Sequence, residues 1–170
     1  FEEFKPDVEV ENYGLKPRTF PGALNIVRQK WLDNDFYGST FALRYEGSKI
    51  LRFTFGGAWN RYVGRHFGKI ISGNYLPAEW VNYEWYRSRA QKTDLNLYGK
   101  MNVEFHPAWN AYVDLQYRGV GYTMAGIGDK RQDIGRTLSY DFFNPKVGLT
   151  HVITPSAKLF TSYSVGSKEQ

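Results

Sequence analysis

Aromatic and guanidinium side chains gather in one polar stretch of the chain, between about residues 63 and 91. Rings that stack and arginines that bind carboxylate or phosphate oxygens suit an aromatic, anionic ligand. The competing interpretation is that the Trp and Tyr residues pack the segment while the arginines stay in solvent. The residues concerned, which the sequence places on a long loop, are Trp80, Tyr83, Trp85, Tyr86, Arg87 and Arg89.

Other reactive residue types do not form a catalytic or metal-binding pattern. His66, His106 and His151 are too far apart in sequence to predict a shared metal site. Asp33 and Asp35, with Asn34 between them, could ligate calcium, but such residues more often occupy turns and strand ends. There is no nucleophile, phosphate-loop or zinc-protease motif. We therefore predict no enzymatic activity, no metal and no cofactor.

Three carboxylates fall on the same polar positions as three cations. They could form a catalytic acid pair, but charge pairing between neighbouring strands is the favoured interpretation. The carboxylates are Asp94, Glu104 and Asp114, and the cations are Arg52, Lys100 and Arg118.

The elements that would position these residues are long β-strands. Between residues 92 and 122 apolar and polar side chains alternate with period two on both sides of a short turn at His106–Ala108. Each arm alternates for about ten residues, which is about the length of strand that crosses a bilayer. One face is predicted to contact lipid, and its residues are Leu95, Leu97, Met101, Val103, Ala111, Val113 and Leu115.

Six strands can be assigned, at about residues 35–45, 49–62, 92–105, 109–122, 138–153 and 158–166, after a loop at 1–28. Short turns and long connections alternate, so all the short turns fall at one end of the sheet. Outer-membrane barrels have this asymmetry. Six strands do not close a barrel, for which about eight are needed. We therefore predict an all-β, antiparallel up-and-down meander that is part of a larger transmembrane β-barrel covering residues 1–170.

Composition agrees with this fold class and limits others. The chain has 170 residues, no Cys, and 18% aromatic residues, and its mean hydropathy of −0.53 argues against a transmembrane helix. The net charge of +5 comes from scattered residues rather than a basic stripe, so we predict no nucleic-acid partner. The first residue is Phe1 and no signal peptide is evident, which suggests a processed chain or part of a longer one.

The most distinctive blocks of the sequence are Gln29–Gly38, Gly56–Tyr62 with His66–Gly68, Asp114–Arg118 and Phe142–Leu149. In this order they resemble TonB-dependent outer-membrane receptors, and the similarity extends from about Gln29 to Lys168. The resemblance implies a barrel segment, without the N-terminal plug, of a Gram-negative active transporter. It also implies localisation in the outer membrane, contact with its lipid, coupling to the TonB complex through the plug, and a small-molecule ligand such as a ferric siderophore, haem or cobalamin. The alternative is a soluble all-β binding module.

Overall fold

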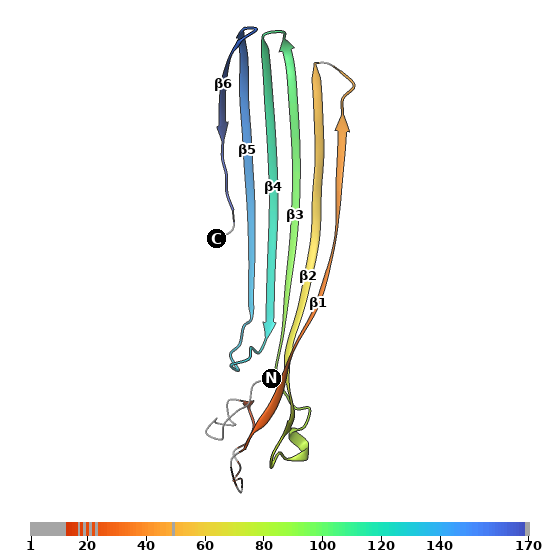
Figure 1. The fold of residues 1–170 in the computed structure, drawn as a ribbon, viewed down its shortest axis with the longest axis vertical. Helices are drawn as coiled ribbons and strands as arrows, with labels where there is room; N and C mark the ends of the chain where they lie inside the picture. Colours follow the sequence, from red (N-terminus) through yellow and green to blue (C-terminus); the bar gives the residue numbers. More distant parts are fainter. Residues whose placement is uncertain are drawn as a thin grey trace. The chain divides into compact units, whose positions relative to one another are not determined.

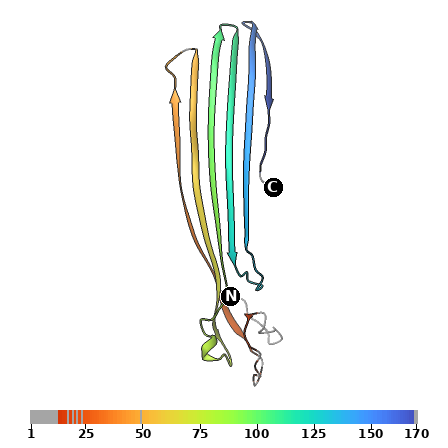
Figure 2. The same ribbon diagram turned by 180° about the vertical axis from the view of Figure 1, so that it is seen from behind.

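Six antiparallel strands form one sheet in the computed structural model, which describes residues 13–16, 18, 20, 22, 24–48 and 50–168. The strands follow one another in chain order across the sheet, so each is bonded to its sequence neighbour (Figures 1 and 2). The elements are β1 (Ile26–Tyr45), β2 (Leu51–Gly73), the 3₁₀ turn η2 (Ala78–Trp80), β3 (Glu84–His106), β4 (Trp109–Gly126), β5 (Arg136–Thr154) and β6 (Ala157–Ser164).

The predicted antiparallel meander of long strands is confirmed. The β5–β6 pair illustrates its register, with Leu149 opposite Thr161 and His151 opposite Leu159. Among the described residues no helix is long and apolar enough to span a membrane.

Several strand bounds differ from the sequence prediction. β1 begins at Ile26 instead of about residue 35, so the predicted loop at 1–28 is too long; its residues 1–12, 17, 19, 21 and 23 lie outside the described residues. β2 continues to Gly73 and β3 begins at Glu84, which reduces the predicted connection of residues 63–91 to Asn74–Tyr83. Backbone hydrogen bonds continue the strands where side chains no longer alternate, so these extensions leave no mark in the hydrophobic pattern.

The remaining differences in strand bounds are smaller. β4 continues to Gly126, and β5 runs from Arg136 to Thr154. β6 begins at Ala157 and ends at Ser164. The predicted second strand was placed from Lys49, which lies outside the described residues.

The chain divides into two compact units, which we describe separately. Unit 1 comprises residues 1–36, 62–92 and 122–138, and unit 2 comprises residues 37–61, 93–121 and 139–170. The connections Asn74–Tyr83 and Ile127–Gly135 belong to unit 1, whereas the short turns after β1, β3 and β5 belong to unit 2.

Unit 2 is a sheet with two chemically different faces. A Cβ at Gly57 would meet Leu97 and Phe41, whereas one at the adjacent Gly56 would meet the Tyr98 hydroxyl at 2.6 Å. Consecutive strand residues point to opposite sides, so the first face is apolar and the second is polar. Large apolar side chains on the first face remain exposed, for example Phe41 (52%) and Leu115 (42%).

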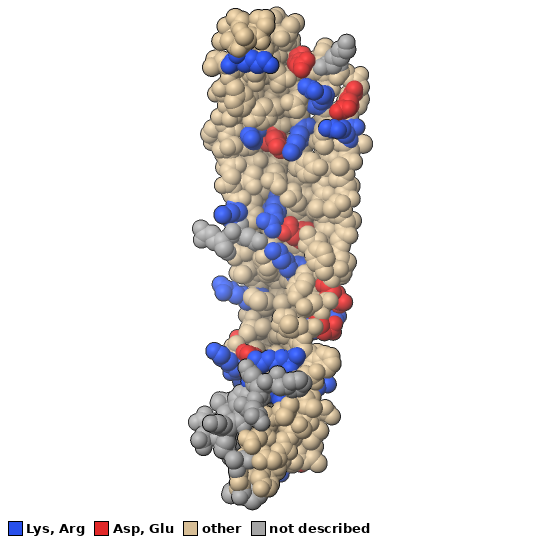
Figure 3. All heavy atoms as spheres, in the orientation of Figure 1, with Lys and Arg blue, Asp and Glu red and all other residues tan. Residues whose placement is uncertain are grey.

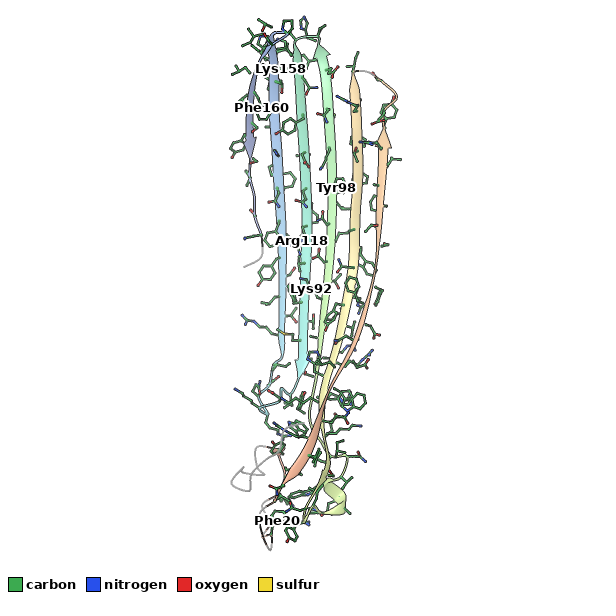
Figure 4. The ribbon with its side chains drawn as sticks, in the orientation of Figure 1. Phe20, Lys92, Tyr98, Arg118, Lys158 and Phe160 are labelled. Carbon is green, nitrogen blue, oxygen red and sulfur yellow. The ribbon has the colours of Figure 1, made fainter. Side chains whose placement is uncertain are left out.

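The polar face of unit 2 carries the predicted cross-strand charge pairs. Arg118 lies on β4 and Asp94 on β3, and Arg118 Nε donates to both Asp94 carboxylate oxygens at 3.2 Å. Figure 4 shows Arg118 and Tyr98 on these neighbouring strands. Basic and acidic side chains lie next to one another on the face seen in Figure 3, instead of forming separate patches. The other two pairs are Lys100–Asp114 (3.7 Å) and Arg52–Glu104 (3.4 Å).

Unit 1 contains a hydrophobic core. Side chains from the segment before β1 pack against β2, β3 and η2, and Phe20, Leu76 and Tyr83 lie around them. We call this core the Trp85 cluster. Its buried residues are Tyr13, Leu15, Leu24, Ile26, Ile70, Trp80, Trp85 and Tyr86.

Candidate functional site

Trp85 is at the centre of the candidate site and is 1% exposed. Its ring meets Tyr86 at a centroid distance of 5.1 Å and Tyr13 at 5.5 Å, both edge-to-face. Gly68 makes this packing possible, because a Cβ there would overlap the rings of Trp85 and Tyr86. The Trp85 indole N–H finds no hydrogen-bond acceptor in the part of the chain that the structure describes.

Arginines surround this aromatic core. The Arg28 guanidinium lies 5.7 Å from the Trp85 ring centroid and donates to the Tyr13 hydroxyl at 3.1 Å. Arg131 Nη1 donates to the Trp85 carbonyl oxygen at 3.0 Å. At the other side of the cluster Arg18 lies 5.9 Å from the Trp80 ring centroid and forms an ion pair with Glu79 at 2.8 Å. Cations over ring faces in a partly desolvated setting are favourable contacts.

Burial also changes the acidity of the Tyr13 phenol. Tyr13 is 4% exposed, and removing it from water raises its pKa to about 12. The phenol is therefore neutral at physiological pH, and its oxygen accepts the hydrogen bond from Arg28.

The structure separates the six residues that the sequence grouped on one loop. Trp80 and Tyr83 do lie on the connection after β2, whereas Trp85, Tyr86, Arg87 and Arg89 are on β3, so the loop placement was wrong for these four. Trp80, Trp85 and Tyr86 are buried, and Tyr83 packs against them. The aromatic rings therefore pack the segment, which agrees with the interpretation that the Trp and Tyr residues have a structural role.

Arg87 and Arg89 are exposed on β3, outside the buried cluster. Arg87 binds both carboxylate oxygens of Glu84 at 2.6 Å and lies 4.4 Å from the Phe67 ring centroid. Phe67 in turn stacks on Trp31 with an interplanar angle of 7°.

Tyr13, Arg28 and Arg131 were missed by the sequence analysis. They come from three separate segments and reach Trp85 only in the folded chain, so no spacing rule could bring them together. Unusual backbone is a weak local signal at two of these positions, since Arg131 has φ +63° and Gly14, beside Tyr13, has φ +69°.

The other candidate ligating residues have protein partners. Asp33 and Asp35 each accept a hydrogen bond from Arg65 Nη1 at 3.1 Å, so a cation already lies between them. His106 and His151 both lie at the β3–β4 turn in unit 2, where the Nδ1 atom of each contacts the Ala108 backbone. His66 belongs to unit 1. Among the described residues no group of three His, Asp or Glu side chains is placed to hold a metal ion.

A meander of long strands with one apolar and one charged face is the architecture of a transmembrane β-barrel segment. The chain matches the family described as "TonB dependent receptor-like, beta-barrel" over residues 9–168, and it belongs to this family. A comparison with curated proteins gave no match. The family consists of transport receptors of the outer membrane that interact with TonB and with a ligand, which favours a transport receptor over a soluble binding module.

Proposed function

We propose that the chain forms part of the barrel of a Gram-negative active-transport receptor that takes up a scarce small ligand such as a ferric siderophore, haem or cobalamin. The observation that carries the ligand class is the set of arginines around the Trp85 cluster. Arg28 and Arg131 contact the cluster directly, and Arg87 and Arg89 are exposed on the same segment of β3.

The chemistry of this region suits an anionic ligand with unsaturated rings. Guanidinium groups bind carboxylate or phosphate oxygens through two parallel hydrogen bonds. Arg89 offers exposed donors, and Arg87 is exposed beside it with its Nε and Nη2 bound to Glu84, so a ligand would use its remaining Nη1 donors or displace Glu84. The buried rings of Trp80, Trp85 and Tyr86 fix the backbone of this segment. The Trp85 N–H, which has no acceptor among the described residues, is a further donor for a ligand oxygen that enters the cluster.

Other parts of the receptor contact the membrane and the TonB complex. The apolar face of unit 2 contacts outer-membrane lipid through Leu95, Leu97, Met101, Val103, Ala111, Val113 and Leu115, all of which are exposed or half-buried. The TonB complex acts through the plug of the full receptor, and the ligand binds from outside the cell. Neither nucleic acid nor a resident cofactor or metal is part of the proposal.

Removing the exposed arginines from the full receptor tests the ligand class. Arg87→Ala combined with Arg89→Ala should weaken binding of at least one of three probes, a ferric catecholate siderophore, haem or cobalamin, by about tenfold or more. Binding is measured on whole cells, and the amount of receptor in the outer membrane is measured by immunoblotting.

Arg44→Ala is the matched control, because Arg44 is an exposed arginine of unit 2 that pairs with Glu46. Unchanged affinity of the double variant for every probe that the wild type binds would contradict a role for these arginines in ligand capture.

A further inference from the structure

The connection between β4 and β5, Ile127–Gly135, has a shape of its own. Gly128 N–H donates to the Gln132 carbonyl at 2.9 Å, and Ile134 N–H donates to the Gly126 carbonyl at 3.1 Å. The Asp133 carboxylate accepts from Gly135 N–H at 2.8 Å. These internal hydrogen bonds let the loop move as one piece, in the manner of a compact Ω-loop.

Contacts with distant segments hold the loop in place within unit 1. Ile127 N–H donates to the Arg87 carbonyl of β3 at 2.8 Å. Asp129 forms an ion pair with Lys30 of β1 at 3.3 Å. Because β2 and β3 lie between β1 and β4 in the sheet, the loop must cross both of those strands to reach Lys30.

Arg131 completes the attachment at the Trp85 cluster. Its Nη1 donates to the Trp85 carbonyl, and its guanidinium fills the space beside Gly14. A Cβ at Gly14 would lie 2.5 Å from Arg131 Nη2, so any other residue would force the guanidinium to move from this position. Gly14 also has φ +69°, which favours glycine independently of this contact.

The attachment consists of polar contacts that water can replace. Lys30 and Asp129 are 46% and 45% exposed, so salt screens their attraction. Arg131 is exposed and no apolar side chain from the loop is buried among the described residues. A loop held by such contacts can dissociate from the Trp85 cluster while the hydrophobic core stays packed.

We propose that Gly14, Lys30, Asp129 and Arg131 form a clasp that holds the β4–β5 loop over the Trp85 cluster, and that release of the clasp uncovers the cluster. The role of this opening in ligand access rests on the proposed function. The opening itself does not depend on any ligand, because it follows from the contacts alone.

Cysteine labelling of the full receptor in detergent measures the opening directly. Ser88 is 8% exposed and follows Arg87, whose carbonyl oxygen accepts the hydrogen bond from Ile127 at the start of the loop. The 170-residue chain has no cysteine, so Ser88→Cys introduces a single reporter into it; any native cysteine elsewhere in the receptor is replaced first. A maleimide reagent should label it slowly in the wild-type background.

Arg131→Ala should raise the labelling rate by about tenfold, which corresponds to loss of one charge-assisted hydrogen bond. Gly14→Ala should act in the same direction, since it displaces the guanidinium without removing it. Asp129→Asn should raise the rate at low salt and abolish its dependence on salt. Lys130→Ala is the control, because Lys130 is an exposed cation of the same loop and is not one of the clasp residues.

Equal labelling of all variants, or an effect of Lys130→Ala as large as that of Arg131→Ala, would overturn the clasp. Heat-modified migration on gels shows whether each variant is folded. Binding of ferric catecholate, haem and cobalamin is measured separately: if no probe binds while labelling follows the expected order, the ligand proposal fails and the clasp stands.

Discussion

The polar face of unit 2 contains ion pairs whose burial differs sharply. The Asp94 and Arg118 side chains are 12% and 29% exposed, whereas those of Asp114 and Lys100 are 32% and 56% exposed. Removing one partner of a largely buried ion pair costs more stability than removing one partner of an exposed pair, because the remaining charge is left partly desolvated.

Asp94→Ala should therefore lower the stability of the full receptor by about 1–3 kcal/mol. Asp114→Ala, which removes a carboxylate from the same face, should cost at most about 1 kcal/mol. Denaturant unfolding in detergent, followed by tryptophan fluorescence, compares the two. Equal costs would show that burial does not distinguish the pairs.

Tyr13 makes the stability of unit 1 depend on pH in the alkaline range. Its pKa is about 12 in the folded chain, against an ordinary value of 10.0. Because the pKa is raised, the stabilisation that buried Tyr13 contributes is fully present below pH 10. It is lost as the pH rises through about 12, since the phenol ionises at lower pH when it is exposed to water than when it is buried.

The tyrosinate absorbance of the wild type and of Tyr13→Phe is measured as the pH is raised, and the second is subtracted from the first. The difference should show one phenol that titrates near pH 12 while the segment before β1 stays packed. The loss of stability between pH 10 and 12 should be smaller in Tyr13→Phe. A difference spectrum with a midpoint near 10.0 would mean that the phenol is solvated.

At the scale of the strand, glycines in similar sequence settings have different surroundings. A Cβ at Gly57 of β2 would lie 2.7 Å from the Asn96 carbonyl oxygen, which is backbone and cannot move aside. At Gly99 of β3, no atom of the described residues beyond its two chain neighbours lies within 4 Å of the corresponding position.

Gly99→Ala should stabilise the receptor by about 0.5–1 kcal/mol, because alanine loses less backbone freedom on folding. Gly57→Ala should destabilise it, since strand β3 would have to shift. Thermal unfolding of both variants in one detergent shows whether each substitution raises or lowers the stability. A stabilising Gly57→Ala would contradict the close approach of β2 and β3.

The two faces of β3 and β4 provide a test of the lipid assignment. Val103→Arg and Val113→Arg should each cost about 2–4 kcal/mol if these positions lie near the middle of the bilayer. Asn102→Arg and Asp114→Arg change adjacent residues on the polar face and should cost much less. Equal tolerance of arginine on both faces, measured by unfolding in lipid vesicles, would refute the assignment.

Sequence patterns predicted the strands best where two different phases border the sheet. Alternation located β4 from its first residue and found the turns at His106–Ala108 and around Pro155. It missed the outer parts of β2 and β3, where Arg65, His66 and Lys69 on β2, and Tyr86, Arg87 and Arg89 on β3, leave neither strand a regular apolar side. Backbone hydrogen bonds need no particular side chain, so such strand extensions leave little trace in the sequence.

The site was harder to predict than the sheet for a related reason. Local composition indicated that Trp80, Trp85 and Arg87 belong to one region. Their division between a buried core and an exposed strand depends on Tyr13 and Arg131, which approach from segments far away in the chain. Contacts of that kind follow from the complete fold.

At the scale of the whole molecule, the apolar face of unit 2 predicts how the isolated chain behaves. Large exposed apolar side chains such as Phe41, Leu115 and Leu159 form more apolar surface than a protein in water usually leaves open. The chain should sediment as aggregates or oligomers in buffer and as small particles in detergent. A monomer that unfolds in one step without detergent would favour a soluble module instead.

The order of the strands has a consequence for how the sheet comes into being. Every strand pairs with the strand just before it in the chain, so each new pairing closes only a short stretch of chain. A sheet of this kind can grow by zippering from one hairpin, with its latest strand always serving as the template for the next. Its formation therefore requires no search among distant partners, and a slow step would have to arise at the Trp85 cluster, where Tyr13 must find β3 across more than seventy residues of chain.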